Sequence, residues 1–107
     1  MAEGAGALVL ESLESAQARG AKILGVMEGA GEMADAFHRT RSSPDGKPII
    51  GCIRNAITDA GLSPDDIDYV NPHGTGTSEN DKMEALGVMS VFGARAPIGS
   101  CGVGSPA

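Results

Sequence analysis

The stretch over residues 69–81 combines residue types that can bind a ligand. It reads Tyr-Val-Asn-Pro-His-Gly-Thr-Gly-Thr-Ser-Glu-Asn-Asp. A neutral imidazole at His73 can donate a hydrogen bond to a developing oxyanion or act as a base. The glycines allow the backbone to approach a ligand closely, and the hydroxyls of Thr75 and Thr77 donate and accept hydrogen bonds. The spacing therefore predicts a ligand-facing loop around His73.

The same residues also have simpler interpretations. A histidine beside Gly-Thr repeats is typical of a turn, and the hydroxyls of Thr75 and Thr77 can cap a following helix. Without further support, Glu84 is a solvated helix residue. A phosphate-cradling loop is another alternative because the stretch is rich in glycine, although it carries neither a Gly-Lys-Ser/Thr nor a G-x-G-x-x-G fingerprint.

Composition narrows the classes of function. The 107 residues suffice for one small domain, and a net charge of −6 without a basic stripe argues against nucleic-acid binding. The sequence shows neither a signal peptide pattern nor an apolar run near the roughly 20 residues that cross a bilayer. Cys52 and Cys101 fit no metal spacing, and Cys52 is expected to be a small core residue. We expect a cytoplasmic protein without a metal site.

The elements expected around the loop alternate between strands and helices. Apolar runs predict strands over residues 5–10, 22–27, 68–71 and 96–100. Helices are predicted from a Ser12 cap to residue 19 and from residue 48 to a stop at Gly61, with a single helical turn after Ser63. A last helix is predicted from a Ser78 or Asn80 cap to about residue 92, and Met83, Leu86 and Ser90 mark one face of it. This order predicts an α/β domain, a mixed sheet with covering helices.

Several motifs of this chain resemble one enzyme family. Residues 71–77 and 80–85 resemble the signature N-A-H-G-T-(G/S)-T…D-x-x-E-A of β-ketoacyl-acyl carrier protein synthases, the type II elongation condensing enzymes. Residues 3–11, 18–23, 35–38 and 54–61 resemble further segments of that family, in the same order. The resemblance covers about residues 2–93. It implies a partial thiolase-like fold.

The resemblance also implies a reaction and its partners. These enzymes join an acyl group on an active-site cysteine to malonyl carried on acyl carrier protein, by a decarboxylative Claisen condensation. They need no cofactor of their own, because phosphopantetheine on acyl carrier protein carries the substrates. Expected partners are acyl carrier protein, the remainder of the synthase and, as the family is typically homodimeric, a second copy. The basic residues Arg39, Arg41 and Lys47 either steer the acidic carrier or form a solvated loop.

Site residues follow from the matched positions. His73 is implied to be the first histidine of a Cys-His-His centre, which stabilises the enolate formed on loss of CO₂. Glu84 matches a buried glutamate that supports the active-site lysine. The implied substrate-binding residues are Thr75 and Thr77 on the phosphopantetheine arm, with His38 and Thr40 near its entrance.

Departures from the family limit what this chain can do alone. Neither Cys52 nor Cys101 matches the nucleophile, no lysine or histidine follows Lys82, and Pro72 replaces the usual alanine before the histidine. We therefore expect a fragment, with a partial ketoacyl synthase C-terminal domain over residues 1–93, a short strand and tail over residues 94–107, and no activity in isolation. The alternatives are a non-catalytic module that binds acyl carrier protein or phosphopantetheine, and a phosphate-binding domain.

Overall fold

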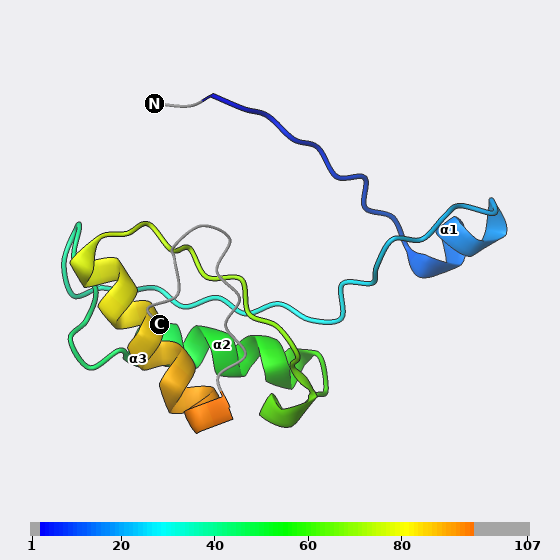
Figure 1. Cartoon of the computed structure of the whole chain (residues 1–107). Helices are drawn as coiled ribbons and strands as arrows, with labels where there is room; N and C mark the ends of the chain where they lie inside the picture. The colour runs from blue at the N-terminus through cyan, green and yellow to red at the C-terminus, as the bar shows by residue number, and fades with distance from the viewer. Residues whose placement is uncertain (1–2, 96–107) are drawn as a thin grey trace, which may run out of the picture.

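The computed structural model describes residues 3–95 as a helical body with a projecting arm (Figure 1). The α-helices are α1 (Leu13–Ala18), α2 (Lys47–Asp59) and α3 (Ser78–Phe92), and the 3₁₀ helices are η1 (Pro64–Asp66) and η2 (Gly93–Arg95). The arm carries α1 and returns to the body as an irregular segment that runs along α2. The strand expected over residues 96–100, Cys101 and the tail lie outside the described residues.

The helix boundaries follow the capping signals of the sequence. Ser12 Oγ accepts a hydrogen bond from the Ser15 amide at 3.2 Å and caps α1. Gly20, Gly61 and Gly93 follow α1, α2 and α3 with φ values of 66°, 68° and 61°. This left-handed backbone costs glycine little, so these residues end the helices as predicted.

The start and the buried face of α3 differ from the prediction. Thr77, not Ser78 or Asn80, is the N-cap residue. Met83 is buried as predicted, but Leu86 and Ser90 are exposed, and Gly87 and Val88 are buried instead. The reason is close packing against α2, because a Cβ atom on Gly87 would lie 2.2 Å from Cγ2 of Ile49. The glycine lets the two helices approach along this face.

Within residues 3–95 the predicted mixed sheet does not form. Among residues 3–95 the only β-type residue is Val70, as an isolated bridge, and the segments 5–10 and 22–27 are irregular. Leu8 and Val9 are each 88% exposed. A strand is defined by its hydrogen bonds to a neighbouring strand, and apolar side chains on both faces need a layer on each side. The apolar runs marked residues that suit burial, but no described part of the chain covers them.

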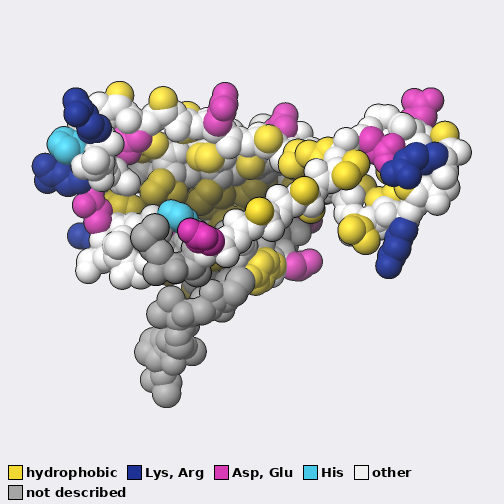
Figure 2. All heavy atoms as spheres, turned by 90° about the horizontal axis from the view of Figure 1, so that it is seen from above, with side chains coloured by type: hydrophobic (Ala, Val, Ile, Leu, Met, Phe, Trp, Pro, Cys, Tyr) yellow, Lys and Arg dark blue, Asp and Glu magenta, His cyan; other side chains and the backbone are white. Residues whose placement is uncertain are grey.

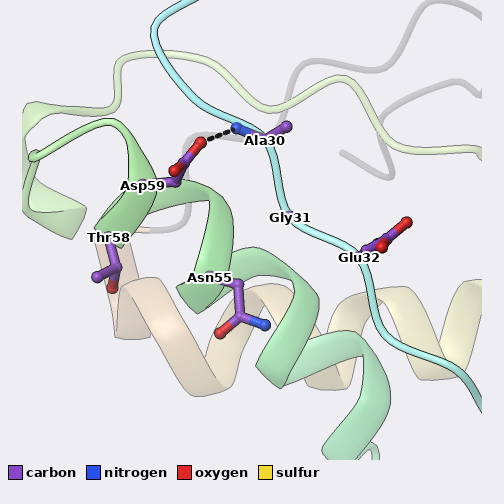
Figure 3. Close-up of a pocket in the computed structure, with 6 residues that line it drawn as sticks. All are labelled: Ala30, Gly31, Glu32, Asn55, Thr58 and Asp59. Carbon is purple, nitrogen blue, oxygen red and sulfur yellow. Dashed lines mark hydrogen bonds between the residues drawn. The ribbon is translucent and has the colours of Figure 1, made fainter.

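The irregular segment over residues 29–31 packs tightly on α2. The Ala30 amide donates to Asp59 Oδ2 at 2.9 Å (Figure 3). Cys52 Sγ donates to the Gly31 carbonyl at 3.0 Å. A Cβ atom on Gly31 would lie 2.3 Å from the Cys52 carbonyl oxygen, so only glycine fits there. Cys52 makes this contact but is only half-buried, whereas the sequence predicted a core residue.

Two classes of site find no support in this part of the chain. No helix within residues 3–95 is both long and apolar enough to cross a membrane. The same residues contain no cluster of three or more His, Cys, Asp or Glu that could hold a metal ion.

Candidate functional site

The candidate site is the loop over residues 71–77, which leads from Val70 into the first turn of α3. His73 is exposed. Gly74 and Gly76 have φ values of 58° and 76°, which are backbone conformations that favour glycine. The sequence predicted a ligand-facing loop here, and the structure shows an exposed histidine in an irregular loop that also holds two glycines with positive φ.

Glu84 holds the backbone at the histidine. Its Oε1 accepts the His73 amide at 2.6 Å, and its Oε2 accepts the Gly74 amide at 2.8 Å. Two successive backbone N–H groups form a concave site for an anion, and here the carboxylate of the chain's own α3 fills it. We call this arrangement the Glu84 clamp. It fixes the main chain from which the imidazole projects.

The clamp also sets the ionisation of its carboxylate. Partial burial raises the pKa of Glu84, but the hydrogen bonds from the Gly74 and His73 amides and from Asn80, with the nearby His73 charge, together outweigh it. The pKa of Glu84 therefore lies below its ordinary value. Glu84 is half-buried, so the interpretation as a freely solvated helix residue is wrong.

The two threonines bond each other rather than cap α3. Their Oγ1 atoms lie 2.8 Å apart, and the Thr77 amide donates to Thr75 Oγ1 at 3.3 Å. The N-cap residue Thr77 makes no side-chain capping bond. Both residues are exposed, so this hydrogen-bonded pair of hydroxyls, which lies close to His73 in the sequence, is accessible.

The hydrogen bonds of this loop argue against a phosphate cradle. The His73 and Gly74 amides donate to Glu84, the Gly76 amide to Asp81 Oδ1 at 3.3 Å, and the Thr77 amide to Thr75. Four of the N–H groups that would bind a phosphate already have partners, and two of those partners are carboxylates that would repel it. The chemistry left to the loop is that of its side chains, foremost the imidazole.

His38 and Thr40 lie in a second loop with its own hydrogen bonds. The Thr40 amide donates to His38 Nδ1 at 3.2 Å. Asp35 closes this loop by accepting the Ser43 amide at 2.7 Å and the Ser43 hydroxyl at 2.9 Å. The Ser43 amide, followed by the Phe37 amide, lowers the pKa of Asp35. Figure 2 shows the two histidines of the chain well apart, one of them at an end of the molecule among Lys and Arg side chains.

One residue of the site was missed by sequence reasoning. Asn80 Nδ2 donates to Glu84 Oε2 at 2.7 Å and to Asp81 Oδ1 at 3.2 Å. The sequence treated Asn80 as a possible helix cap. The i,i+4 spacing of Asn80 and Glu84 was the available signal, because such pairs are neighbours on a helix surface.

Protonation of Glu84 should open the clamp. A carboxyl group whose pKa is lower in the folded than in the unfolded chain stabilises the fold fully above its unfolded value, about 4.3. That stability is lost as the pH falls through the folded pKa. We expect the His73 and Gly74 amide resonances to titrate together with a midpoint below about 4.3 in an NMR pH series. A midpoint above that value, or the same titration in Glu84→Gln, would show that the clamp is absent.

Comparisons with known proteins agree on one group. Residues 24–106 match the family model described as beta-ketoacyl synthase, C-terminal domain. The chain is 46% identical over 93 residues to 3-oxoacyl-[acyl-carrier-protein] synthase 2 of Staphylococcus aureus, covering 87% of this chain and 23% of that protein. It is 48% identical over 93 residues to nodulation protein E of Rhizobium meliloti, with the same coverage.

Solved structures give the same result. A beta-ketoacyl synthase from Burkholderia phymatum matches with a TM-score of 0.77 and 38% identity, over 82% of this chain and 21% of that one. The ishigamide ketosynthase/chain length factor matches with a TM-score of 0.75 and 45% identity, over 81% and 21%. The chain thus spans less than a quarter of the length of the relatives that it matches. The aligned part of the chain is similar in fold to these ketosynthase structures, although the expected sheet is not formed within residues 3–95.

Proposed function

The chain belongs to the beta-ketoacyl synthase family, as a C-terminal domain segment, and from this premise we propose that it forms part of a 3-oxoacyl-[acyl-carrier-protein] synthase. Such a synthase would act in fatty acid or polyketide biosynthesis, and on the same premise we place it in the cytoplasm. The observation that carries the proposal is the exposed His73 in the loop before α3, with its main chain tied to Glu84. This arrangement leaves the imidazole as the group that meets substrate.

The proposed chemistry is a decarboxylative Claisen condensation. The malonyl thioester loses CO₂, and the electron pair of the broken C–C bond becomes an enolate. An N–H of the His73 imidazole donates a hydrogen bond to the enolate oxygen and stabilises its charge. The enolate carbon then attacks an acyl thioester on a cysteine, which leaves as thiolate. Cys52 does not fit that role, because it is half-buried and bonded to Gly31. Cys101 does not match the nucleophile in sequence, so we assign the cysteine to the rest of the synthase.

The remaining site residues receive substrate-binding roles. We assign the Thr75 and Thr77 hydroxyls to the amide groups of the phosphopantetheine arm, because the pair is exposed and can both donate and accept. His38 and Thr40 are assigned to the entrance of that arm. No cofactor of the synthase itself enters this chemistry, since the carrier brings the thioester. Glu84 supports the site through the backbone of His73, and a lysine from the rest of the synthase remains its second proposed partner.

One exposed surface and two relatives support the proposed protein partners. The apolar arm, with Leu8, Val9 and Leu24 each more than 80% exposed, fits burial against the remainder of the synthase. A second synthase subunit is also proposed, and the solved relatives include a ketosynthase in complex with its chain length factor. Another relative is a ketosynthase in complex with a type II polyketide acyl carrier protein, which supports the carrier as a partner.

Charge reversal in the basic loop should weaken carrier binding. Arg39 and Arg41 are exposed on a chain that is otherwise acidic, so they offer a local positive surface to an acidic carrier. We expect Arg39→Glu/Arg41→Glu to weaken the binding of acyl carrier protein by at least about tenfold at low salt, with less effect at high salt. An NMR titration of labelled carrier measures this. Arg54→Glu, an exposed arginine on α2, is the control, and equal weakening by both variants would exclude the basic loop as the docking surface.

The proposed function is tested by a segment exchange. The matched 93-residue segment of the Staphylococcus aureus synthase is replaced by that of this chain, and 3-oxoacyl product is measured with acyl and malonyl carrier substrates. We expect product from the chimera and none from the isolated chain, which lacks the nucleophile. A folded chimera that binds carrier protein but forms no product would favour the alternative, a non-catalytic module for acyl carrier protein or phosphopantetheine.

A further inference from the structure

Two carboxylates of α3 anchor the loop, and one amide lies between them. Glu84 holds the His73 and Gly74 amides, and Asp81 holds the Gly76 amide. The side-chain nitrogen of Asn80 lies 2.7 Å from Glu84 Oε2 and 3.2 Å from Asp81 Oδ1. Because both neighbours are acceptors, the NH₂ group of Asn80 must face them, and each of its two hydrogens has one carboxylate to bond.

From this geometry we propose that Asn80 is a positioning residue for His73, which acts by holding both anchoring carboxylates in place. Glu84 and Asp81 are like charges on one turn of a helix, and they would move apart without a donor between them. If Glu84 moved, the N–H groups of His73 and Gly74 would lose their acceptor. Asn80 itself touches no reacting atom. The role in catalysis rests on the proposed function, but the role in the loop does not.

Replacement by aspartate separates this proposal from an ordinary helix position. Asn80 and aspartate have nearly the same shape, and an acid in the first turn of a helix is normally stabilising because of the helix dipole. If Asn80 only fills space in the first turn of α3, Asn80→Asp should leave the loop unchanged or more stable. If its amide bridges the carboxylates, Asn80→Asp removes both donors and adds a third negative charge. The two roles therefore predict opposite signs.

The test is amide hydrogen exchange by NMR on the chain itself. In Asn80→Asp we expect exchange at His73, Gly74 and Gly76 to become at least about tenfold faster, with a smaller change in Asn80→Ala. Asn55→Asp, the same substitution at an exposed position of α2, is the matched control and should not change the exchange rates of these amides. The Ile57 amide in α2 reports whether the chain as a whole has opened.

The outcomes separate the proposal from its premises. Unchanged or slower exchange at the three loop amides in Asn80→Asp would overturn it. If Ile57 also loses protection in Asn80→Asp, Asn80→Ala decides, because it adds no charge: selective loss at the loop supports the proposal and no loss overturns it. In an active chimera, Asn80→Asp should lower kcat about tenfold and leave KM nearly unchanged, as expected for a group that orients rather than binds. An inactive chimera with a disturbed loop would count against the proposed function alone.

Discussion

Gly31→Ala is expected to lower the free energy of unfolding of this chain by about 3 kcal/mol, or roughly 10–20 °C in Tm. The added Cβ would lie 2.3 Å from the Cys52 carbonyl oxygen and 2.5 Å from the Ala56 nitrogen. Both are backbone atoms of α2, so no side chain can rotate away. The segment over residues 29–31 must lift off the helix and give up its hydrogen bonds to Cys52 and Asp59.

Urea and thermal unfolding measure this effect against a matched glycine. No atom lies within 4 Å of a Cβ atom built on Gly25, in the same irregular segment. Gly25→Ala should therefore change stability by less than about 1 kcal/mol, with any gain coming from reduced freedom of the unfolded chain. If Gly31→Ala and Gly25→Ala have the same free energy of unfolding, the close packing of segment 29–31 on α2 seen in the structure is wrong.

His73→Ala should cause the largest loss of activity. In the chimera we expect condensation to fall by about 10²–10³ in kcat, the usual effect of removing one donor to a developing oxyanion. Acyl transfer to the parent's cysteine should persist, since that residue lies outside the exchanged segment. His73→Gln should retain more activity than His73→Ala, because its amide can still donate a hydrogen bond. Product formation and mass spectrometry of the acylated enzyme measure the two steps separately.

The second histidine provides the control. His38 lies in the loop closed by Asp35 and Ser43, and its Nδ1 is bonded within that loop. His38→Ala should lower kcat by less than about tenfold, with any change mainly in KM. If both alanine variants lose activity equally, or if His73→Ala keeps the parental rate, His73 is not the enolate-stabilising group.

Local signals in the sequence predicted the helices well. The caps and stops at Ser12, Gly20, Gly61 and Gly93 act through hydrogen bonds and backbone angles within a few residues, so they need no distant partner. The turn after Ser63 is an equally local case, since Asp66 accepts both the amide and the hydroxyl of Ser63. The predictions of these elements were correct because the residues that interact lie within a few positions of each other in the chain.

The sheet could not be predicted correctly by the same means. The runs over residues 5–10 and 22–27 have strand composition, but a strand forms only when another backbone pairs with it. Composition indicates that a segment suits burial and does not show whether its partner is present. The prediction of the buried face of α3 was wrong for a related reason. The close approach of Ile49 to Gly87 depends on how α2 packs against α3, which the sequence of α3 alone does not show.

The site was predicted in part. Motif order gave His73 and Glu84 as residues of one site, and the structure brings them together through the backbone amide of His73. The bonds of the His73, Gly74 and Gly76 amides were not predictable, because their acceptors come from α3. The contact of Asn80 with Glu84 had a signal in its i,i+4 spacing, but its second contact, with Asp81, did not. Hydrogen-bond partners of this kind depend on the backbone conformation of the loop. The sequence does not specify that conformation, because Gly74 and Gly76 can adopt positive or negative φ.

The release of CO₂ from malonyl-acyl carrier protein by the chimera is the most direct test of the proposed synthase role, since it isolates the step assigned to His73. We expect the chimera to release CO₂ at a rate within about tenfold of the parent synthase, and His73→Ala to lower that rate by at least about a hundredfold. A folded chimera that releases CO₂ no faster than its His73→Ala variant would contradict the claim that this chain supplies a working part of a ketosynthase site.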